Sequence, residues 1–227
     1  MRNYTIIIPI YNEEKSIPSL LDNLKLYIKN DNEIIIIDDG STDSSNQILK
    51  KNKKINLIQL KNNKGKGYAI RKGLRKAINK KIIIFDGDLE IHTDEIKKLM
   101  ILDKDNNVFS TMGYRFKKIF PLKSVFDLGN FSFTNFYNFL FKTQHRDILC
   151  CAKSFYLDLI KISELKSNSF DIDIELAHFL SKTKSSNNPL QIYIKYKRRK
   201  INEGKKLKIS DGWVILSRII RLNKKNI

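Results

Sequence analysis

Four short runs of apolar, mostly β-branched residues alternate with four amphipathic segments over residues 4–102 of the 227-residue chain. The apolar runs span residues 4–9, 34–37, 55–60 and 81–85, and the segments with helical spacing span 16–29, 43–49, 66–78 and 93–102. Strands that are apolar on both faces and alternate with helices are typical of parallel sheets covered on both sides. The sequence therefore predicts an α/β fold with a mostly parallel central sheet, and functional residues at the carboxyl ends of its strands.

The second half of the chain is less regular. We expect a helix over 171–181, a strand over 192–196 and a basic amphipathic helix over 211–222. The Phe-rich segment 126–141 predicts either a helix or a mobile segment. Because no linker or repeat divides the sequence, we expect one domain over 1–227, made of a first half, 1–104, and a second half, 105–227.

The positive charge is concentrated in two blocks. The formal net charge is +19, from 43 basic and 24 acidic residues. Residues 47–81 hold 13 basic residues and no acid, and residues 182–227 hold 14 basic and two acidic residues. Cationic surfaces of this kind attract nucleic acid, anionic membranes or diphosphates, unless the lysines merely decorate solvated helices.

The cysteines and histidines show no pattern of a disulfide framework or of a metal site. The adjacent Cys150 and Cys151 form neither a disulfide scaffold nor a Cys-x-x-Cys metal pair, so we expect them to pack as small hydrophobic side chains. His92, His145 and His178 lack metal-ligand spacing.

The N-terminus has no secretory h-region, and no run approaches the roughly 20 apolar residues of a membrane span. We therefore expect a cytoplasmic protein.

Paired carboxylates follow the fourth apolar run. Asp86 and Asp88 flank Gly87 directly after the strand predicted over 81–85. Each carboxylate can give one oxygen to a divalent cation, and glycine lets a ligand approach the backbone closely. Hard oxygen ligands favour Mg²⁺ or Mn²⁺, shared with substrate phosphates. Since Asp-x-Asp is common in solvated turns, its position at a strand end is what supports this prediction.

Polar residues also close the first two predicted strands. Pro9, Tyr11, Asn12 and Glu13 follow the first strand, and DDGSTD at 38–43 follows the second. Tyr11 can pack on a base, and an aspartate at the second strand end can accept hydrogen bonds from a base or a ribose. A helix-capping turn would explain one or two residues of 38–43, but not polar residues at three strand ends.

Several segments, in order, resemble the signatures of glycosyltransferase family 2, and more narrowly those of its polyprenyl-phosphate and dolichol-phosphate sugar transferases. They are PIYNEE at 9–14, DDGSTD at 38–43, NKGKGYA at 63–69, DGDLE at 86–90, GYRF at 113–116, FDIDIEL at 170–176 and a tail with Tyr196, Arg199, EGKKL at 203–207 and DG at 211–212. The resemblance implies a Rossmann-like GT-A fold. Residues 1–104 would bind a nucleoside diphosphate sugar, and residues 105–227 would bind the acceptor.

The resemblance also implies roles for individual residues. The nucleotide-sugar site would comprise Pro9, Tyr11, Glu13, Asp38, Asp39, Gly67, Asp86, Gly87, Asp88, Arg115, Arg199, Lys205 and Lys206. Asp86 and Asp88 would hold Mg²⁺ or Mn²⁺ against the diphosphate. Arg199, Lys205 and Lys206 would close over the phosphates, where negative charge grows as the leaving group departs.

The acidic segment 170–176 offers two candidates for the catalytic base of an inverting transfer. Asp173 or Glu175 could take the proton of a sugar hydroxyl, and Asp88 completes the catalytic residues that we predict. Acids in the first turn of a helix also stabilise its dipole without any catalysis. An acceptor that is a lipid phosphate is already anionic and needs no strong base, so the sequence leaves the role of Asp173 open.

The sequence departs from the resembled family mainly on the acceptor side. Gly87 and Glu90 stand where the family more often has alanine and glutamine. CCAK at 150–153 replaces a segment that usually contains a glycine and an aromatic residue before the basic one, and Arg198 replaces a common proline. These differences affect the expected acceptor more than the expected donor.

We therefore expect a metal-dependent hexosyltransferase. Its acceptor would be a polyprenyl phosphate at the inner face of the cytoplasmic membrane, with a soluble glycan or small molecule as the alternative. The basic helix and its apolar face around Trp213 would provide peripheral contact with anionic lipid. Rivals from other classes are a nucleotide-binding pseudoenzyme and a nucleic-acid-binding module, but the basic blocks lack interleaved aromatic residues, so we expect no nucleic-acid partner.

Overall fold

The computed structural model describes residues 3–116, 124–182, 188–199, 204, 206 and 210–224. A seven-stranded sheet forms its centre, in the order β3-β2-β1-β4-β6-β5-β7. The strands are β1 (Tyr4–Ile10), β2 (Glu33–Asp38), β3 (Asn56–Gln59), β4 (Lys81–Ile84), β5 (Ser110–Tyr114), β6 (Lys153–Tyr156) and β7 (Leu190–Tyr193). β6 pairs antiparallel with β4 and β5, whereas the other pairings in the order are parallel, so the prediction of a mostly parallel sheet is confirmed.

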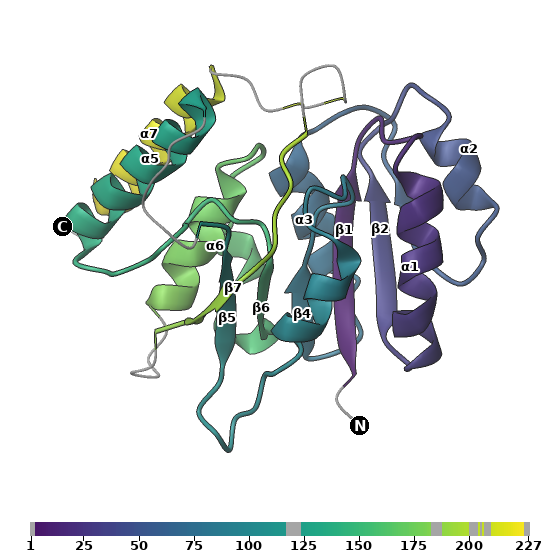
Figure 1. Cartoon of the computed structure of the whole chain (residues 1–227), viewed down its shortest axis with the longest axis horizontal. Helices are drawn as coiled ribbons and strands as arrows, with labels where there is room; N and C mark the ends of the chain where they lie inside the picture. The colour runs from purple at the N-terminus through teal and green to yellow at the C-terminus, as the bar shows by residue number, and fades with distance from the viewer. Residues whose placement is uncertain are drawn as a thin grey trace.

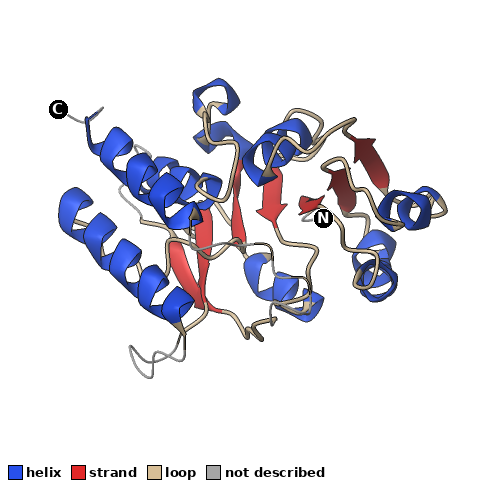
Figure 2. Cartoon of the chain, turned by 90° about the horizontal axis from the view of Figure 1, so that it is seen from above, coloured by secondary structure: helices blue, strands red, loops and turns tan. Residues whose placement is uncertain are grey.

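Helices flank the sheet on both sides (Figures 1 and 2). They are α1 (Ile17–Lys29), α2 (Ser45–Lys50), α3 (Lys66–Leu74), α4 (Ile96–Leu99), α5 (Val125–Phe141), α6 (Ile172–Ser181) and α7 (Asp211–Lys224), with short 3₁₀ turns at Thr93–Glu95, Leu157–Leu159 and Ile162–Glu164. None of the helices in the described ranges combines the length and the apolar character needed to cross a membrane.

Alternate residues of the central strands pack into two cores, one on each face of the sheet. Ile6 and Ile8 of β1 share a core with α1, α2 and α4, whereas Ile7 shares another with α3 and α6. Because both faces are covered, most side chains on either face are apolar. This explains why the first-half strands were visible in the sequence as uninterrupted apolar runs.

Two strands of the second half were not predicted from the sequence. β5 and β6 carry buried polar side chains, and the hydroxyls of Thr111 and Ser154 are hydrogen-bonded at 2.8 Å between them. Lys153 of β6 is fully buried as well. Polar residues that satisfy one another inside a sheet remove the apolar pattern by which strands are recognised. The strand predicted over 192–196 lies instead at 190–193.

The Phe-rich segment forms the helix α5, one of the two predicted alternatives, and lies beside α7 and close to α6 (Figure 1). Tyr137 is buried in the core that joins α5, α6 and α7. Phe139 is 82% exposed, so this aromatic segment is core on one face only. The same core contains two buried histidine contacts: His178 Nδ1 lies 3.0 Å from Tyr137 Oη, and His145 Nε2 lies 2.9 Å from Ser181 Oγ.

Lowering the pH below 6.5 should destabilise this helical layer. Burial, followed by the charge of a nearby lysine, lowers the pKa of His145 and of His178 to about 4. As the pH falls from 6.5 to 4, these histidines bind protons in the unfolded chain before they do so in the folded chain. Each histidine should therefore lower the free energy of unfolding by ~2 to 3 kcal/mol over this range. Urea unfolding across this range should show a steeper loss for the wild type than for the His145→Gln/His178→Gln variant. Parallel pH profiles would contradict the assignment.

Candidate active site

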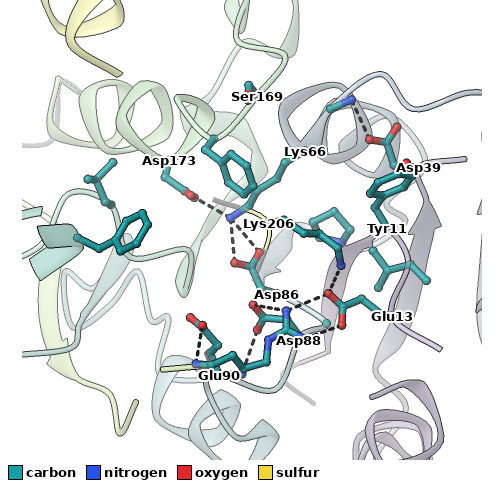
Figure 3. A pocket seen from close by; sticks show the side chains of 18 of the residues that line it. Tyr11, Glu13, Asp39, Lys66, Asp86, Asp88, Glu90, Ser169, Asp173 and Lys206 are labelled. Atoms are coloured by element: carbon teal, nitrogen blue, oxygen red, sulfur yellow. Dashed lines mark hydrogen bonds and ion pairs between the residues drawn. The ribbon is translucent and has the colours of Figure 1, made fainter. Parts of the chain in front are cut away.

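A cavity of about 290 Å³ opens where β1, β2 and β4 end, and the second half of the chain completes its wall (Figure 3). Parallel strands bring their carboxyl ends to one edge of a sheet, so the loops that follow them meet there. Of the predicted site residues, those that line the cavity are Pro9, Tyr11, Glu13, Asp39, Asp86, Gly87, Asp88, Arg115, Asp173, Arg199 and Lys206. Asp38, Gly67 and Glu175 are not part of this lining, and Lys205 falls outside the described residues.

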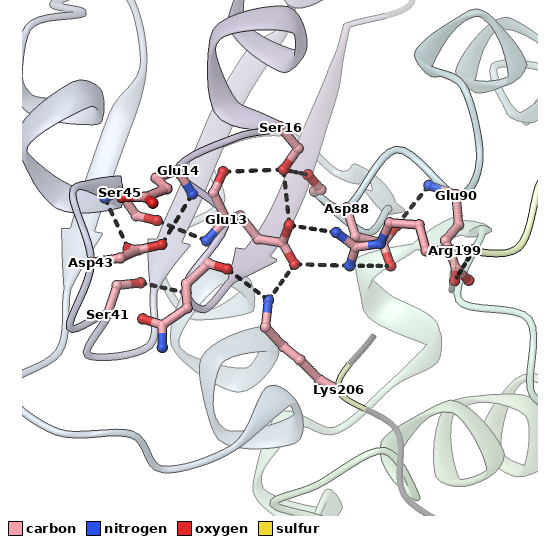
Figure 4. A network of polar contacts seen from close by, with 12 residues as sticks. Glu13, Glu14, Ser16, Ser41, Asp43, Ser45, Asp88, Glu90, Arg199 and Lys206 are labelled. Carbon is pink, nitrogen blue, oxygen red and sulfur yellow. Dashed lines mark hydrogen bonds and ion pairs between the residues drawn. The ribbon is translucent and has the colours of Figure 1, made fainter. Parts of the chain in front are cut away.

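Hydrogen bonds with residues 41–45 shape the loop after β1 (Figure 4). Asn12 adopts the left-handed conformation, with φ of 50°, which asparagine tolerates better than most residues. Its amide donates to Ser41 Oγ at 2.9 Å, and its side-chain oxygen accepts from the Thr42 amide at 2.8 Å. The amide of Glu13 donates to Ser45 Oγ at 2.8 Å. These bonds fix the backbone from which Glu13 reaches into the cavity.

Asp38 and Asp39 occupy different environments although they are adjacent. Asp38 is fully buried, and its carboxylate accepts from the Ser41 amide at 2.9 Å and from Asn46 Nδ2 at 2.8 Å. Asp39 lines the cavity and accepts from the amides of residues 64 and 65, both at 2.8 Å. Burial raises the pKa of Asp39 in spite of these bonds. The positions favour Asp38 as a support for the β2–α2 turn and Asp39 as a ligand contact.

Close packing against residues 167–169 requires glycine at position 67. It lies in the first turn of α3, where its amide donates to the Asn168 carbonyl at 2.9 Å. A Cβ atom at this position would lie 2.3 Å from the carbonyl oxygen of Ser167. The glycine thus allows α3 to approach residues 167–169 closely, which places Lys66, one residue earlier, at the wall of the cavity.

Asp86 and Asp88 leave the end of β4 and project into the cavity. The Glu90 amide donates to Asp88 Oδ1 at 3.0 Å, and Leu89 between them has a φ of 60°. Burial, and then the charges of Asp86 and Glu90, raise the pKa of Asp88 to about 7. A divalent cation would relieve this repulsion, so the two carboxylates fit Mg²⁺ or Mn²⁺. Over the described ranges no cluster of three or more His, Cys, Asp or Glu side chains is arranged for a metal.

Lys66 is a cavity residue that the sequence does not single out. Its ammonium lies 2.9 Å from Asp86 Oδ1 and 2.9 Å from Asp173 Oδ2 (Figure 3). Burial alone would lower the pKa of Lys66, but the charges of Asp173 and Asp86 outweigh it and raise the pKa well above its ordinary value. The only sequence signal is its place between two glycines after a strand end.

Arg199 and Lys206 lie on Glu13 (Figure 4). The Arg199 guanidinium binds both carboxylate oxygens of Glu13, at 2.8 and 3.0 Å, and reaches Asp88 Oδ2 at 3.4 Å. Lys206 donates to the same carboxylate of Glu13. The Glu90 side chain accepts from the Arg199 amide at 2.9 Å, which ties the segment after β7 to the loop that follows β4. Cations from the second half thus face the carboxylates of the first half.

Arg115 lines the other side of the cavity, after β5. The buried Asp147 accepts from Arg115 Nε at 2.7 Å and from Nη2 at 2.9 Å. The guanidinium carbon lies 5.2 Å from the centre of the Tyr196 ring. A bidentate carboxylate and an aromatic face hold the guanidinium in one orientation.

Asp173 and Glu175 both lie in the first turn of α6, but their side chains have different surroundings. Asp173 lines the cavity, and its buried Oδ1 accepts no hydrogen bond in the described part of the chain but lies 3.8 Å from the buried Lys153 ammonium. Glu175 accepts from the amides of residues 166 and 167 at 2.8 to 3.0 Å and lies 3.4 Å from Arg218 Nη1. The geometry favours Asp173 as the residue that meets substrate and Glu175 as a support for the loop before α6.

Replacing Glu175 by glutamine should therefore affect stability rather than catalysis. The new amide group would face two backbone donors with a donor of its own and would lose the charge opposite Arg218. We expect the free energy of unfolding to fall by about 2 kcal/mol, with kcat of the folded protein within about twofold of wild type. Urea titration and steady-state kinetics would measure both. A fall in kcat of about a hundredfold at unchanged stability would restore Glu175 as a catalytic residue.

Comparison with known proteins identifies the family of this chain. The profile described as Glycosyl transferase family 2 matches residues 5–157. An uncharacterised protein of Methanocaldococcus jannaschii is 31% identical over 193 residues, which cover 77% of this chain and 79% of that protein. The undecaprenyl-phosphate 4-deoxy-4-formamido-L-arabinose transferase of Pectobacterium carotovorum is 33% identical over 44% of this chain, and the human dolichyl-phosphate beta-glucosyltransferase is 30% identical over 43%. The aligned parts are only 33% and 35% of those two enzymes.

Solved structures share the fold at low sequence identity. The glucosyl-3-phosphoglycerate synthase of Mycobacterium tuberculosis, in complex with Mn²⁺, UDP and phosphoglyceric acid, superposes with a TM-score of 0.74. The match covers 98% of this chain and 78% of that one at 15% identity. A complex of the same synthase with Mn²⁺, UDP-glucose and glycerol 3-phosphate gives a TM-score of 0.72. The family match and the shared architecture lead to one conclusion: this chain belongs to the glycosyltransferases of family 2 and has the GT-A fold.

Proposed function

We propose that this glycosyltransferase moves a hexose from a nucleoside diphosphate sugar to a polyprenyl phosphate, with Mg²⁺ or Mn²⁺ and with inversion. The observation that carries the proposal is the meeting of Asp86 and Asp88 with Arg199 and Lys206 in one cavity. Departure of a nucleoside diphosphate requires a divalent cation that carboxylates hold against the diphosphate. It also requires cationic side chains on the opposite side that can bind the diphosphate oxygens.

The donor would lie along the ends of β1, β2 and β4. Pro9 and Tyr11 offer an apolar and aromatic wall for the base, and Asp39 an acceptor for its hydrogen-bond donors or those of the ribose. Glu13, now bound by Arg199, would receive the ribose hydroxyls once that guanidinium turns to the phosphates. These assignments agree with the UDP and UDP-glucose named for the mycobacterial synthase structures.

The acceptor side of the cavity combines cations with apolar surface. Its charged members are Arg115 and Arg198. Its apolar and aromatic members are Phe126, Leu149, Phe170, Tyr196 and Ile215. Guanidinium groups beside apolar side chains suit a phosphate that carries a hydrocarbon chain. The named acceptor classes of the two partially matching relatives, undecaprenyl phosphate and dolichyl phosphate, support this substrate.

A soluble phosphorylated acceptor is the second candidate. The mycobacterial synthase, which shares this fold along nearly the whole chain, was solved with phosphoglyceric acid and with glycerol 3-phosphate. Arg115 and Arg198 would bind the phosphate of such a molecule equally well.

We further propose that the protein works at the cytoplasmic face of the membrane and that residues 1–227 act as one domain. The support for membrane contact is an exposed apolar surface on α5 and α7, where Phe139 is 82% and Trp213 73% exposed. Arg221 and Lys224 lie in the last turn of α7. Apolar side chains beside basic ones are typical of helices that lie on anionic lipid. The pairing of β6, from the second half, with β4 supports the single domain.

The test is transfer from a panel of UDP- and GDP-sugars with Mn²⁺, offered polyprenyl phosphate in vesicles, phosphoglyceric acid or glycerol 3-phosphate. We expect transfer to the lipid phosphate only, and co-flotation of the protein with anionic but not neutral vesicles. Transfer to a soluble phosphate alone would favour the second candidate. Metal-dependent nucleotide binding without transfer or hydrolysis would indicate a pseudoenzyme, and absence of nucleotide binding would overturn the proposal.

A further inference from the structure

Lys66 holds the carboxylate that is proposed to bind metal. Its ammonium lies 2.9 Å from Asp86 Oδ1 and 3.0 Å from Asp86 Oδ2, so both oxygens of this aspartate face the same cation. The lysine side chain is 10% exposed. Since few water molecules can reach it, the ammonium and Asp86 interact with little screening.

The position of Lys66 is set by the fold. It is the first residue of α3, and the helix start is fixed by Gly65, whose φ is 92°, and by the close packing of Gly67 on residues 167–169. Asp173 Oδ2 holds the same ammonium at 2.9 Å. One lysine, 10% exposed, therefore bridges two carboxylates, one after β4 and one in α6, that would otherwise repel each other.

A divalent cation on Asp86 must compete with this ammonium. Both oxygens of the carboxylate are engaged, and a second positive charge placed on them would be repelled by Lys66. Asp88 differs, because its nearest cation, Arg199, is 3.4 Å away and binds Glu13 more closely. Asp86 is thus the ligand at which metal entry is opposed.

We propose that Lys66 is the resident counter-cation of Asp86 and gives way to the divalent metal only when the donor diphosphate arrives with it. The inference rests on the proposed function and names a residue that controls how its site is loaded. Asp173 retains the displaced ammonium inside the cavity, where the negative charge of the diphosphate compensates for the loss of Asp86. Metal and nucleotide should therefore bind cooperatively, and Lys66 should be a source of that cooperativity.

The test measures Mn²⁺ binding by electron paramagnetic resonance, with and without UDP or GDP, on the wild type and on Lys66→Met. The matched control is Lys64→Met, which removes the same charge two residues earlier, from an exposed side chain outside the cavity lining. Without nucleotide, Lys66→Met should bind Mn²⁺ about tenfold tighter than wild type or more. The added nucleotide should then improve Mn²⁺ affinity less than it does in the wild type, whereas Lys64→Met should match the wild type in both measurements.

A second pair of variants guards against loss of folding when Asp86 and Asp173 lose their shared lysine. Lys66→Met/Asp173→Asn removes one charge of each sign and should bind Mn²⁺ more tightly than Asp173→Asn alone. Equal or weaker Mn²⁺ binding by the Lys66 variants, while wild type binds Mn²⁺ with UDP or GDP, would overturn the inference and leave the proposed function standing. Failure of every protein to bind Mn²⁺ with either nucleotide would overturn both.

Discussion

Replacing Asp88 by asparagine should lower kcat for sugar transfer by about a thousandfold. The amide keeps the size of the side chain and can still accept the hydrogen bond from the Glu90 amide. It removes the negative charge that would bind the divalent cation and, through it, the departing diphosphate. The loss should appear in kcat at saturating Mn²⁺ and donor, because stabilisation of the leaving group is greatest in the transition state.

Asp105→Asn provides the control for this experiment. Asp105 is exposed in the turn before β5 and is not part of the cavity lining, and its replacement changes the charge of the protein by the same amount. We expect its kcat to equal that of wild type. If Asp88→Asn retained activity within about threefold of wild type at every Mn²⁺ concentration, Asp88 would not be a metal ligand.

Replacing Arg199 by methionine should lower kcat/KM for the donor by about a hundredfold. The guanidinium bridges Glu13 and Asp88, so it lies between the proposed nucleoside and metal positions. Methionine preserves much of the side-chain volume but can neither bind a phosphate oxygen nor neutralise Glu13. Initial rates at varied donor concentration would give the change in kcat/KM.

Arg198→Met is the informative neighbour for comparison. Arg198 contacts Ser124 and Asp127 at the start of α5, on the acceptor side of the cavity. Its replacement should raise KM for the acceptor and leave KM for the donor within about threefold of wild type. The reverse pattern, in which Arg199→Met changes the acceptor KM alone, would reassign the two arginines.

The first half of the fold was predictable because its chemistry is uniform. β1, β2 and β4 are buried on both faces, so the interior of each strand is apolar, and their buried polar residues, such as the hydrogen-bonded Thr5 and Glu33, lie near the strand ends. The second half hides its strands, because the hydrogen-bonded hydroxyls of Thr111 and Ser154 are partners distant in sequence, and the buried Lys153 lies 3.8 Å from Asp173. A prediction from the sequence pattern includes the polar residue but not the partner whose contact permits its burial.

The same limit applies to the site. The sequence does not distinguish Asp173 from Glu175, because both lie in one acidic segment. In the structure, the packing of α6 places Asp173 at the cavity and Glu175 at the amides of residues 166 and 167. Lys66 needed the structure for another reason. Its two carboxylate partners, Asp86 and Asp173, are 20 and 107 residues away, and no local motif records a cation between them.

The reversed direction of β6 has a consequence for how such enzymes could change acceptor. Ile84, at the end of β4, pairs with Lys153, at the beginning of β6, so the chain enters this strand at the rim where β4 leaves it. The residues that lead into Lys153 therefore arrive beside the loop that follows β4, although β6 runs opposite to the parallel strands. On the proposed function, this short segment, which ends in CCAK, could differ between related enzymes while the loops after β1, β2 and β4 stay unchanged. Acceptor choice would then be a transplantable property, open to chimeras that keep the nucleotide-sugar half unchanged.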